Sequence, residues 1–600
     1  MTTKYLVGIT IGPVQEYIQE SRKLKDLYNS SKIISDIIKS MIDEISKHTS
    51  VEQIYPNTSL SNDVNSSLQV DFSNYSIFII DKCIDIDEIR EQVYENIENE
   101  NKQFLNYKVD FKFEESLHMF WSMKELKNDD DYCEVYRELT YEISSLKNTY
   151  NFDQVEQLGQ RKCLICGKRN ISTKNIKNSF NNQEELCDQC LFKRVYPKGQ
   201  SIKSVYSIAI DSWKNTYVNE IKILTDKLGE VFELGHEDKY YNPQEIDNVI
   251  PVLEQCERGV PSKLQSKINE LFSDFKKKNN TQYVRNEIVK QLKEIKKMMI
   301  KIYDVGKVPL PNYEYCFIQM DVDSLGKIIS DKYKDLKDTQ KEISARLILF
   351  GKEVREKLNS IATVIYAGGD DILIVCCLER MFEVVKIIEN KFKNVKQKYK
   401  EITYSKEITY SMSITIAQCK DPMSYALYRT RCELENVKER YNYRYFAEVK
   451  NGVSFNYMIN GSKEVCAYFK NERFIKYINR NTEIKKVEKE KVFSYINKFY
   501  DEFKKMKFND LTFDEGQSLQ EMFSKELERL IKKSFKVNGI NSKINKSTGE
   551  YIDWLLEFIC GVITENHFQE RSNHVSIDFQ NIMNVLRIYK KLCLIENEEA

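Results

Sequence analysis

The sequence predicts an α+β protein with two ferredoxin-like domains, and three observations support this fold class. Residues 309–465 follow the order strand, helix, strand, strand, helix, strand, which is the βαββαβ order of a ferredoxin-like antiparallel sheet. Residues 1–155 also mix strand and helix patterns, and we interpret them as a candidate diverged copy of that unit. Two CxxC pairs between the units predict an inserted metal-binding module.

Apolar spacing places the elements of the N-terminal unit. The stretch KYLVGITIG predicts a strand, and Val14, Ile18 and Leu24 then recur at helical spacing in one long helix. The strands between residues 48 and 82 are poorly marked. We further expect a helix over the apolar positions from 34 to 45, a strand at 75–81, a helix near 87–107 and a strand around HMFWSM.

The second unit is marked more clearly, because apolar strands alternate with long amphipathic helices. Its sheet should be antiparallel and covered on one face by the helices. The expected elements are a strand YCFIQMD, a helix at 339–359, a strand IATVIYA, a turn, a strand DILIVCC, a helix at 379–401, a strand YSMSITIAQC and a helix at 422–441.

A chain of 600 residues is too long for one hydrophobic core, and roughly three to five domains are expected. We place them at 1–155 (first α+β domain), 156–200 (zinc-ribbon module), 201–308 (helical), 309–465 (second α+β domain) and 466–600 (C-terminal helical). The lysine clusters at 274–280 and 293–301 are interpreted as solvated helix faces, with nucleic-acid contact as the alternative.

The composition points to a cytoplasmic protein without a membrane segment. The 91 Lys and Arg residues balance the 91 Asp and Glu residues, so total charge favours neither nucleic acid nor a membrane surface. The longest apolar runs, such as ILIVCC, are far shorter than a membrane span, and no apolar leader opens the chain.

Four of the fifteen cysteines form a pattern. Cys163 and Cys166 make one CxxC pair, Cys187 and Cys190 make another, and 20 residues separate the pairs. This spacing is typical of a zinc ribbon, and a four-thiolate zinc has no open coordination position, so the ion would be structural. A redox CxxC motif and chance pairing are the alternatives.

Two acidic clusters follow neighbouring strands of the second unit. The hairpin YAGGDDILIV carries Asp370 and Asp371. Taken alone, these acids could simply lie in a turn and contribute only to solubility. The strand FIQMDVD ends in Asp321 and Asp323, and in a βαββαβ sheet that strand lies beside the hairpin. Carboxylates gathered at one sheet edge repel each other unless cations bind, and Mg²⁺ or Mn²⁺ prefers such oxygen ligands.

Two such ions are what nucleotidyl transfer uses, one to activate a hydroxyl and one to neutralise phosphates. Gly368 and Gly369 would let the backbone approach a substrate closely. Lys327, Lys438 and Arg440 are candidate phosphate-binding cations, with plain solvent exposure as the alternative.

With these motifs, the sequence resembles the large subunit of type III-B CRISPR effector complexes, whose palm domain carries GGDD. The resemblance rests on AGGDD with an upstream MDVDSLGK, on the four-cysteine module between two palm-like domains, and on IGPVQEYIQESRKLKDLYNSSKIIS near the N-terminus. The last of these motifs is the most specific to the family.

The resemblance implies two palm domains that face each other and bind nucleotide between them, with catalytic acids in the second palm only. Asp321 and Asp370 would bind magnesium, and Asp371 and Asp323 would support them. The remaining residues assigned to nucleotide binding by this resemblance are Gly12 and Ser31 of the first palm, together with Lys327, Gly368, Gly369 and Lys438.

By resemblance, such a subunit works in a ribonucleoprotein with guide RNA and other CRISPR subunits. Binding of target RNA would activate conversion of ATP to cyclic oligoadenylates, a nucleotide second messenger for antiviral defence. Transfer of AMP to S-adenosylmethionine as co-substrate is the alternative reaction. The histidine-aspartate nuclease domain that many relatives carry in front is expected to be absent.

Two further function classes stay open. A non-catalytic scaffold that binds RNA and partner subunits is the first, although both acid clusters argue against it because repelling carboxylates cost stability without a metal. A diguanylate cyclase is the second, but the turn sequence GGDDIL differs from that family's usual glutamate and phenylalanine.

Overall fold

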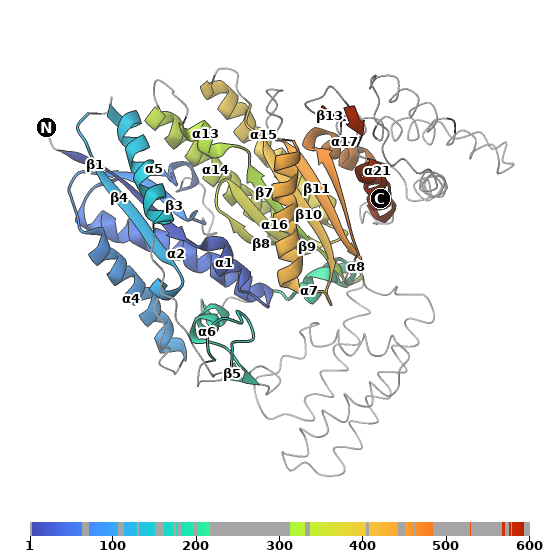
Figure 1. Cartoon of the computed structure of the whole chain (residues 1–600), viewed down its shortest axis with the longest axis horizontal. Helices are drawn as coiled ribbons and strands as arrows, with labels where there is room; N and C mark the ends of the chain where they lie inside the picture. Colours follow the sequence, from blue (N-terminus) through green and yellow to red (C-terminus); the bar gives the residue numbers. More distant parts are fainter. Residues whose placement is uncertain are drawn as a thin grey trace, which may run out of the picture.

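The fold is taken from a computed structural model, which is shown in Figure 1. The structure describes residues 3–62, 71–105, 113–128, 131–149, 161–171, 176–177, 183–196, 202–216, 312–330, 336–403, 407–441, 450–459, 463–483, 529, 558, 567–569, 575–577 and 579–592. Most of the helical region predicted at 201–308, both lysine clusters and most of the C-terminal region lie outside these residues.

The N-terminal unit is built on a four-stranded antiparallel sheet with the strand order β2-β3-β1-β4. Its chain order is strand, helices, two strands, helix, strand, which is the βαββαβ order. The strands are β1 (Lys4–Gly12), β2 (Val51–Tyr55), β3 (Tyr75–Ile80) and β4 (His118–Leu126), and the helices are α1 (Val14–Gln19), α2 (Leu24–His48), α3 (Ser59–Asn62), α4 (Ile86–Leu105) and α5 (Tyr132–Asn148).

Both faces of this sheet are buried, because side chains of β1 alternate between two cores. Val7 and Ile9 pack with α2 and α4, whereas Leu6 packs with Leu139 and Ile143 of α5 on the opposite face. Gly8 lets α5 approach closely, since an added Cβ would lie 2.5 Å from Cδ1 of Ile143.

The second unit is a six-stranded sheet with the strand order β12-β11-β10-β7-β9-β8. The predicted βαββαβ elements of this unit are all confirmed, and strands β11 and β12 extend the sheet beyond them. The elements are β7 (Glu314–Val322), α13 (Leu325–Ser330), α14 (Leu336–Leu358), β8 (Thr363–Ala367), β9 (Asp371–Cys377), α15 (Met381–Thr403), β10 (Tyr410–Gln418), α16 (Met423–Arg440), β11 (Gly452–Ile459) and β12 (Lys463–Lys470).

The expectation that helices cover only one face of the second sheet is wrong. Cys316 and Ile318 lie in a core with α14 and α15, while Tyr315 and Phe317 on the other face join a core that contains residues of α1, α2 and α16. The second face is therefore covered by α16 and by the N-terminal unit, and Figure 1 shows α16 across this sheet. The two units share one hydrophobic core.

Smaller elements complete the described part of the chain. The cysteine module contains β5 (Ile176–Lys177), β6 (Gln183–Glu184) and α6 (Asp188–Val195), and it lies below the N-terminal unit in Figure 1. The helices α7 (Val205–Ala209) and α8 (Asp211–Thr216) follow it. Beyond the second sheet come α17 (Asn471–Glu483), β13 (His567–Gln569), β14 (Val575–Ile577) and α21 (Phe579–Leu592).

Helix α21 covers the edge strand β12 of the large sheet. The side-chain amide of Asn581 accepts a hydrogen bond from the Tyr468 N–H at 2.8 Å and donates to the Tyr468 carbonyl at 3.0 Å. It therefore satisfies both backbone groups of this edge residue, as a neighbouring strand would. Edge strands left unpaired invite aggregation, and this contact closes part of the edge. Within the described residues, no helix is long and apolar enough to cross a membrane.

Candidate functional site

The two acidic segments of the second unit are neighbours in the sheet, as predicted. Strand β7 pairs antiparallel with β9, and Asp321 lies directly opposite Asp371. The Val322 N–H donates to the Asp370 carbonyl at 2.9 Å, which ties the end of β7 to the turn of the β8–β9 hairpin. Asp321, Asp370 and Asp371 therefore come to one edge of the sheet.

The turn needs glycine at positions 368 and 369 for different structural reasons. Gly369 has φ +107°, a conformation that side chains rarely adopt, and an added Cβ would face Leu347 and Ile348 of α14 at ordinary contact distance. An added Cβ at Gly368 would lie 3.3 Å from Asp371 Oδ1, beside the acids. Gly368 thus leaves room at the acids, whereas Gly369 permits the turn.

A cavity of about 330 Å³ lies where these acids meet the N-terminal unit. Of the residues assigned from the sequence, six line it, namely Ser31, Asp321, Gly368, Asp370, Asp371 and Lys438. Side chains of the N-terminal unit, including Tyr55 and Asp71, form the facing wall. A volume in this range is typical of small-ligand pockets.

Four of the residues assigned from the sequence do not line this cavity: Gly12, Asp323, Lys327 and Gly369. Gly12 ends β1 opposite His118, and its nearest neighbour is the ring of Phe120. Arg440, the other candidate cation, also lies elsewhere, with its guanidinium 4.9 Å from the ring centroid of Tyr468.

Burial makes the acid pair of the turn hard to ionise. Desolvation first, and then the charge of Asp321, raise the pKa of Asp370 to about 6. Desolvation and the neighbouring Asp370 raise the pKa of Asp371 well above its usual value. A nearby cation would therefore strongly stabilise the ionised form of these two carboxyl groups.

One cation already contacts Asp321. Lys438 on α16 places its Nζ 2.8 Å from Asp321 Oδ2 and 3.1 Å from Glu435 Oε1. Arg431 lies two turns earlier on the same helix, is 8% exposed, lines the cavity and donates to the Gln15 carbonyl at 3.2 Å. Arg431 is not among the residues assigned from the sequence, although its spacing of seven from Lys438 indicates a shared helix face.

Magnesium has suitable donors here, although the acids are not a closed cage. Asp321 and Asp370 offer hard oxygen ligands at a cavity, and Mg²⁺ is usually held by one or two carboxylates together with substrate phosphates. Within the described parts of the chain, only the four cysteines bring three or more ligand atoms within 4.8 Å of one another. The acids therefore fit an ion that is completed by a substrate.

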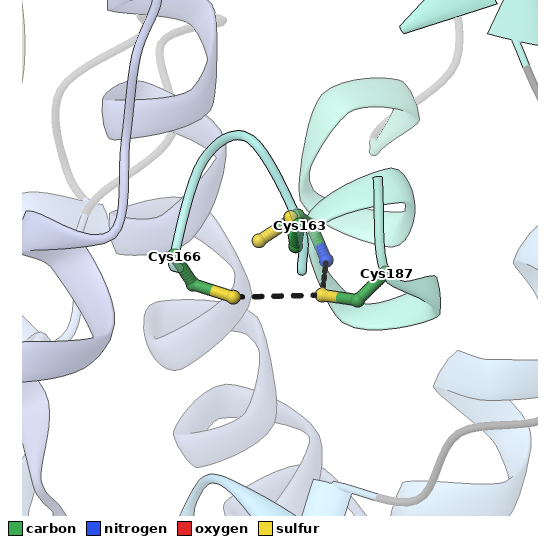
Figure 2. Close-up of side chains that lie close together, drawn as sticks. Cys163, Cys166 and Cys187 are labelled. Atoms are coloured by element: carbon green, nitrogen blue, oxygen red, sulfur yellow. Dashed lines mark hydrogen bonds between the residues drawn. The ribbon is translucent and has the colours of Figure 1, made fainter. Parts of the chain in front are cut away.

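The four predicted cysteines come together. Their Sγ atoms all lie within 4.8 Å of one another, and the Cys166 and Cys187 sulfurs, 3.8 Å apart, face each other in Figure 2. Cys187 caps α6, where its sulfur accepts from the Cys190 N–H at 3.5 Å. Four converging thiols are compatible with a structural zinc site.

The cysteine module is attached to α1 and α2. Lys193 donates from Nζ to the Tyr17 carbonyl at 2.6 Å, and its own carbonyl accepts from Asn29 Nδ2 at 2.6 Å. Arg194 forms an ion pair with the buried Asp26, and Arg169 pairs with Glu20 at 3.0 Å. The N-terminal motif singled out by sequence thus supplies the contacts that hold this module.

Asp323 lies beyond the end of β7 and anchors three neighbouring segments. Its carboxylate is 1% exposed and accepts from Thr409 Oγ1 at 2.8 Å, from Ser411 Oγ at 2.8 Å and from the Asn451 N–H at 2.9 Å. These bonds use both of its oxygens. The geometry indicates a structural anchor that joins β7, β10 and the entry to β11.

Replacing Asp323 with alanine should therefore destabilise the second unit without removing an acid from the cavity. One buried and two partly buried donors would lose their acceptor, at a cost of about 3 kcal/mol in free energy of unfolding. Chemical denaturation measures this change, with Asp323→Asn as the milder variant that retains one acceptor oxygen. An unchanged unfolding midpoint for Asp323→Ala would contradict the anchor.

A βαββαβ sheet with acids at the end of its first strand and in its central hairpin has the architecture of a nucleotidyl cyclase-like palm domain. In agreement, residues 314–444 match the family model described as Cas10/Cmr2, second palm domain. Residues 6–106 match the model described as CRISPR-associated protein Cmr2, N-terminal. The two matches fall on the two sheet units.

Individual proteins agree with these matches. The Cmr subunit Cmr2 of the CRISPR system of Pyrococcus furiosus is 27% identical over 283 residues, which cover 40% of this chain and 30% of that protein. The chain also resembles a type III-B Cmr-β structure in the apo state, with a TM-score of 0.52 and 13% identity over 98% of this chain and 82% of that one. A Cmr-β structure bound to cognate target RNA gives a TM-score of 0.54 at 11% identity, over 98% and 83% of the two chains.

The family matches and the Pyrococcus relative support a Cmr2/Cas10 subunit. The structural neighbours share the fold at low identity. The aligned region spans less than a third of the Pyrococcus protein.

Proposed function

We propose that this protein is the RNA-activated nucleotidyltransferase subunit of a type III CRISPR complex and makes a nucleotide second messenger, cyclic oligoadenylate, from ATP. The observation that carries the proposal is the cavity in which three acids of the second unit and Lys438 face the N-terminal unit. Its size and its mixture of acids and polar groups suit a nucleotide with bound metal.

In this proposal Asp321 and Asp370 hold Mg²⁺ or Mn²⁺, and Asp371 and Lys438 assist. The bound ion supplies charge neutralisation on the triphosphate and activation of the attacking hydroxyl. Asp371 lies directly opposite Asp321 in the sheet and adds a third carboxyl group beside the proposed ligands. Lys438 exchanges its contact with Asp321 for a phosphate oxygen, since an ammonium group binds phosphate as a point charge.

The wider assignments are proposals as well. The two sheet units act as two palms, Ser31 contributes to a nucleotide site on the first palm, and the four cysteines hold structural zinc. Guide RNA and other CRISPR subunits are the partners, and target RNA is the activator. The family matches on both units support this assembly.

The product identifies the reaction directly. We expect mass spectrometry to detect oligoadenylates after the assembled complex is incubated with target RNA, Mg²⁺, ATP and S-adenosylmethionine. An AMP adduct of S-adenosylmethionine would replace the proposed reaction by the alternative transfer. No product from an intact, RNA-bound complex would favour the non-catalytic scaffold instead.

Replacing Lys438 with alanine should raise the KM for ATP by about tenfold or more, because a charged hydrogen bond to phosphate contributes about 1.5–3 kcal/mol. Binding of Mn²⁺ without nucleotide should not weaken, since the variant removes a cation that competes for Asp321. Steady-state kinetics and Mn²⁺ titration measure the two effects.

Arg440→Ala is the matched control, because Arg440 lies near the same end of α16 but contacts the ring of Tyr468. Its kinetics should equal those of the wild type. A Lys438→Ala variant with an unchanged KM would remove Lys438 from the proposed substrate contacts.

A further inference from the structure

The N-terminal unit contacts the hairpin that carries the acids through Asp71. Asp71 Oδ2 accepts from the Ala367 N–H at 3.0 Å, and its carboxylate also forms an ion pair with Arg355 of α14. Arg355 in turn donates to the Val364 carbonyl at 3.2 Å. Both members of the ion pair are largely buried, so Asp71 fixes strand β8 immediately before the Gly-Gly turn.

A second contact reaches the turn itself. Tyr55, the last residue of β2, donates its hydroxyl to Asp370 Oδ1 at 3.2 Å. Ser73 lies against the turn as well, because an added Cβ on Gly368 would be 3.7 Å from its Cα. The N-terminal unit therefore touches the backbone before the turn, the turn glycine and the acid that follows it.

The chain segment that follows Tyr55 is itself attached to the second unit. The Asn57 N–H donates to Ser344 Oγ at 2.8 Å, and Asn57 Nδ2 donates to the Lys341 carbonyl at 3.1 Å, so the chain after β2 is attached to α14. Helix α14 packs under the hairpin on the other side, where Leu347 contacts the Gly369 position. The turn is enclosed between β2 and α14.

We infer that Tyr55 and Asp71 are positioning residues, by which the N-terminal unit holds the Gly368–Asp371 turn in the geometry that binds metal. The inference rests on the proposed function, since it gives Asp370 the role of a ligand. A hydroxyl that donates to Oδ1 orients the carboxylate and leaves Oδ2 for a cation. Removal of such an orienting partner typically weakens metal affinity or activity 10–100-fold.

Two variants, each with a matched control, test this inference in the full-length chain. Tyr55→Phe removes the hydroxyl from Asp370, and Tyr132→Phe removes a hydroxyl that crosses the same interface to Gln340 at 2.6 Å without touching the turn. Asp71→Asn removes the charge at the hairpin, and Glu52→Gln removes the charge that pairs with Lys341.

The readouts are Mn²⁺ affinity, hydrogen exchange of the amides from 366 to 372, and product formation. Tyr55→Phe should weaken Mn²⁺ binding about tenfold and lower kcat more than it raises KM, because it removes the hydroxyl that contacts Asp370 but keeps the ring in the cavity wall. Asp71→Asn should speed exchange at the turn about tenfold through loss of a charged hydrogen bond. Both controls should leave the turn and Mn²⁺ binding as in the wild type.

Unchanged Mn²⁺ affinity in Tyr55→Phe together with unchanged turn exchange in Asp71→Asn would overturn the inference. If Asp71→Asn does not fold, the test rests on Tyr55→Phe alone. The inference would then be refuted if Tyr55→Phe changes Mn²⁺ affinity and turn exchange no more than Tyr132→Phe does. If the wild type makes no nucleotide product but the variants alter Mn²⁺ binding and exchange as expected, the proposed function fails while the positioning role stands.

Discussion

Replacing both Asp370 and Asp371 with alanine should abolish nucleotide product while the fold and the assembly of the complex persist. The variant removes one proposed metal ligand and the acid next to it, which also lines the cavity. Loss of several kcal/mol of charge stabilisation at the metal corresponds to a rate decrease of about 10³-fold or more. The thermal midpoint should stay the same or rise, because two partly buried carboxyl groups that repel each other when ionised are removed.

Product is measured by mass spectrometry and folding by thermal melting, with Asp338→Ala as the control. Asp338 is an exposed acid on α14 of the same unit, so its loss should affect neither measurement. Continued synthesis by the Asp370→Ala, Asp371→Ala double variant would remove the acids of the turn from the mechanism. Loss of product together with loss of folding would show that the acids are needed for structure instead.

The neighbourhood of the acids was predictable from the sequence, because it follows from topology. A βαββαβ order places the first strand beside the central hairpin, so Asp321 and the acids of the turn had to approach each other. The direct pairing of Asp321 with Asp371 follows from that order. Local apolar patterns were enough to predict these strands, since β7, β8 and β9 are almost wholly buried and mostly apolar.

The separation of Asp321 from Asp323 was not predictable in the same way. Both acids come at the end of the same predicted strand, FIQMDVD, which suggested that they share one edge of the sheet. Strand β7 ends at Val322, however, and Asp323 lies outside the strand, in the turn that it forms with Ser324, whose φ is 57°. Asp323 therefore contacts Thr409 and Ser411 while Asp321 lines the cavity.

The resemblance implied that the first unit faces the acids, and its Ser31 lines the cavity, but Tyr55 and Asp71 of the same wall were not predicted. Tyr55 ends a five-residue strand with only one buried position, and such a pattern gives little periodicity to recognise. Its contact with Asp370 joins residues 315 apart in the chain, and only the packing of the two units creates it.

The single long helix expected after the first strand is two helices, α1 and α2. The break between them has a local cause, since the N–H groups of Arg22 and Lys23 donate to Asp26 and begin a new helix.

The cysteine module should control the shape of the cavity from outside it. Helices α1 and α2 supply Val14, Ile18, Ser31 and Ile34 to the cavity wall. The same helices are held by the module through Asp26 and its partner Arg194, and removal of one member of a buried ion pair costs about 3–5 kcal/mol. Zinc binding in such modules contributes folding free energy directly. Disordering the module therefore loosens one wall of the cavity.

Replacing Cys187 with serine should accordingly abolish bound zinc, lower the thermal midpoint and weaken nucleotide binding, although Cys187 does not line the cavity. Zinc content, melting and nucleotide titration measure these effects, and Cys83→Ser is the control because Cys83 is exposed and lies outside the four-cysteine cluster. The acids of the second unit are untouched, so Mn²⁺ should still bind there. A zinc-free Cys187→Ser protein with wild-type melting and nucleotide affinity would show that α1 and α2 keep their places without the module.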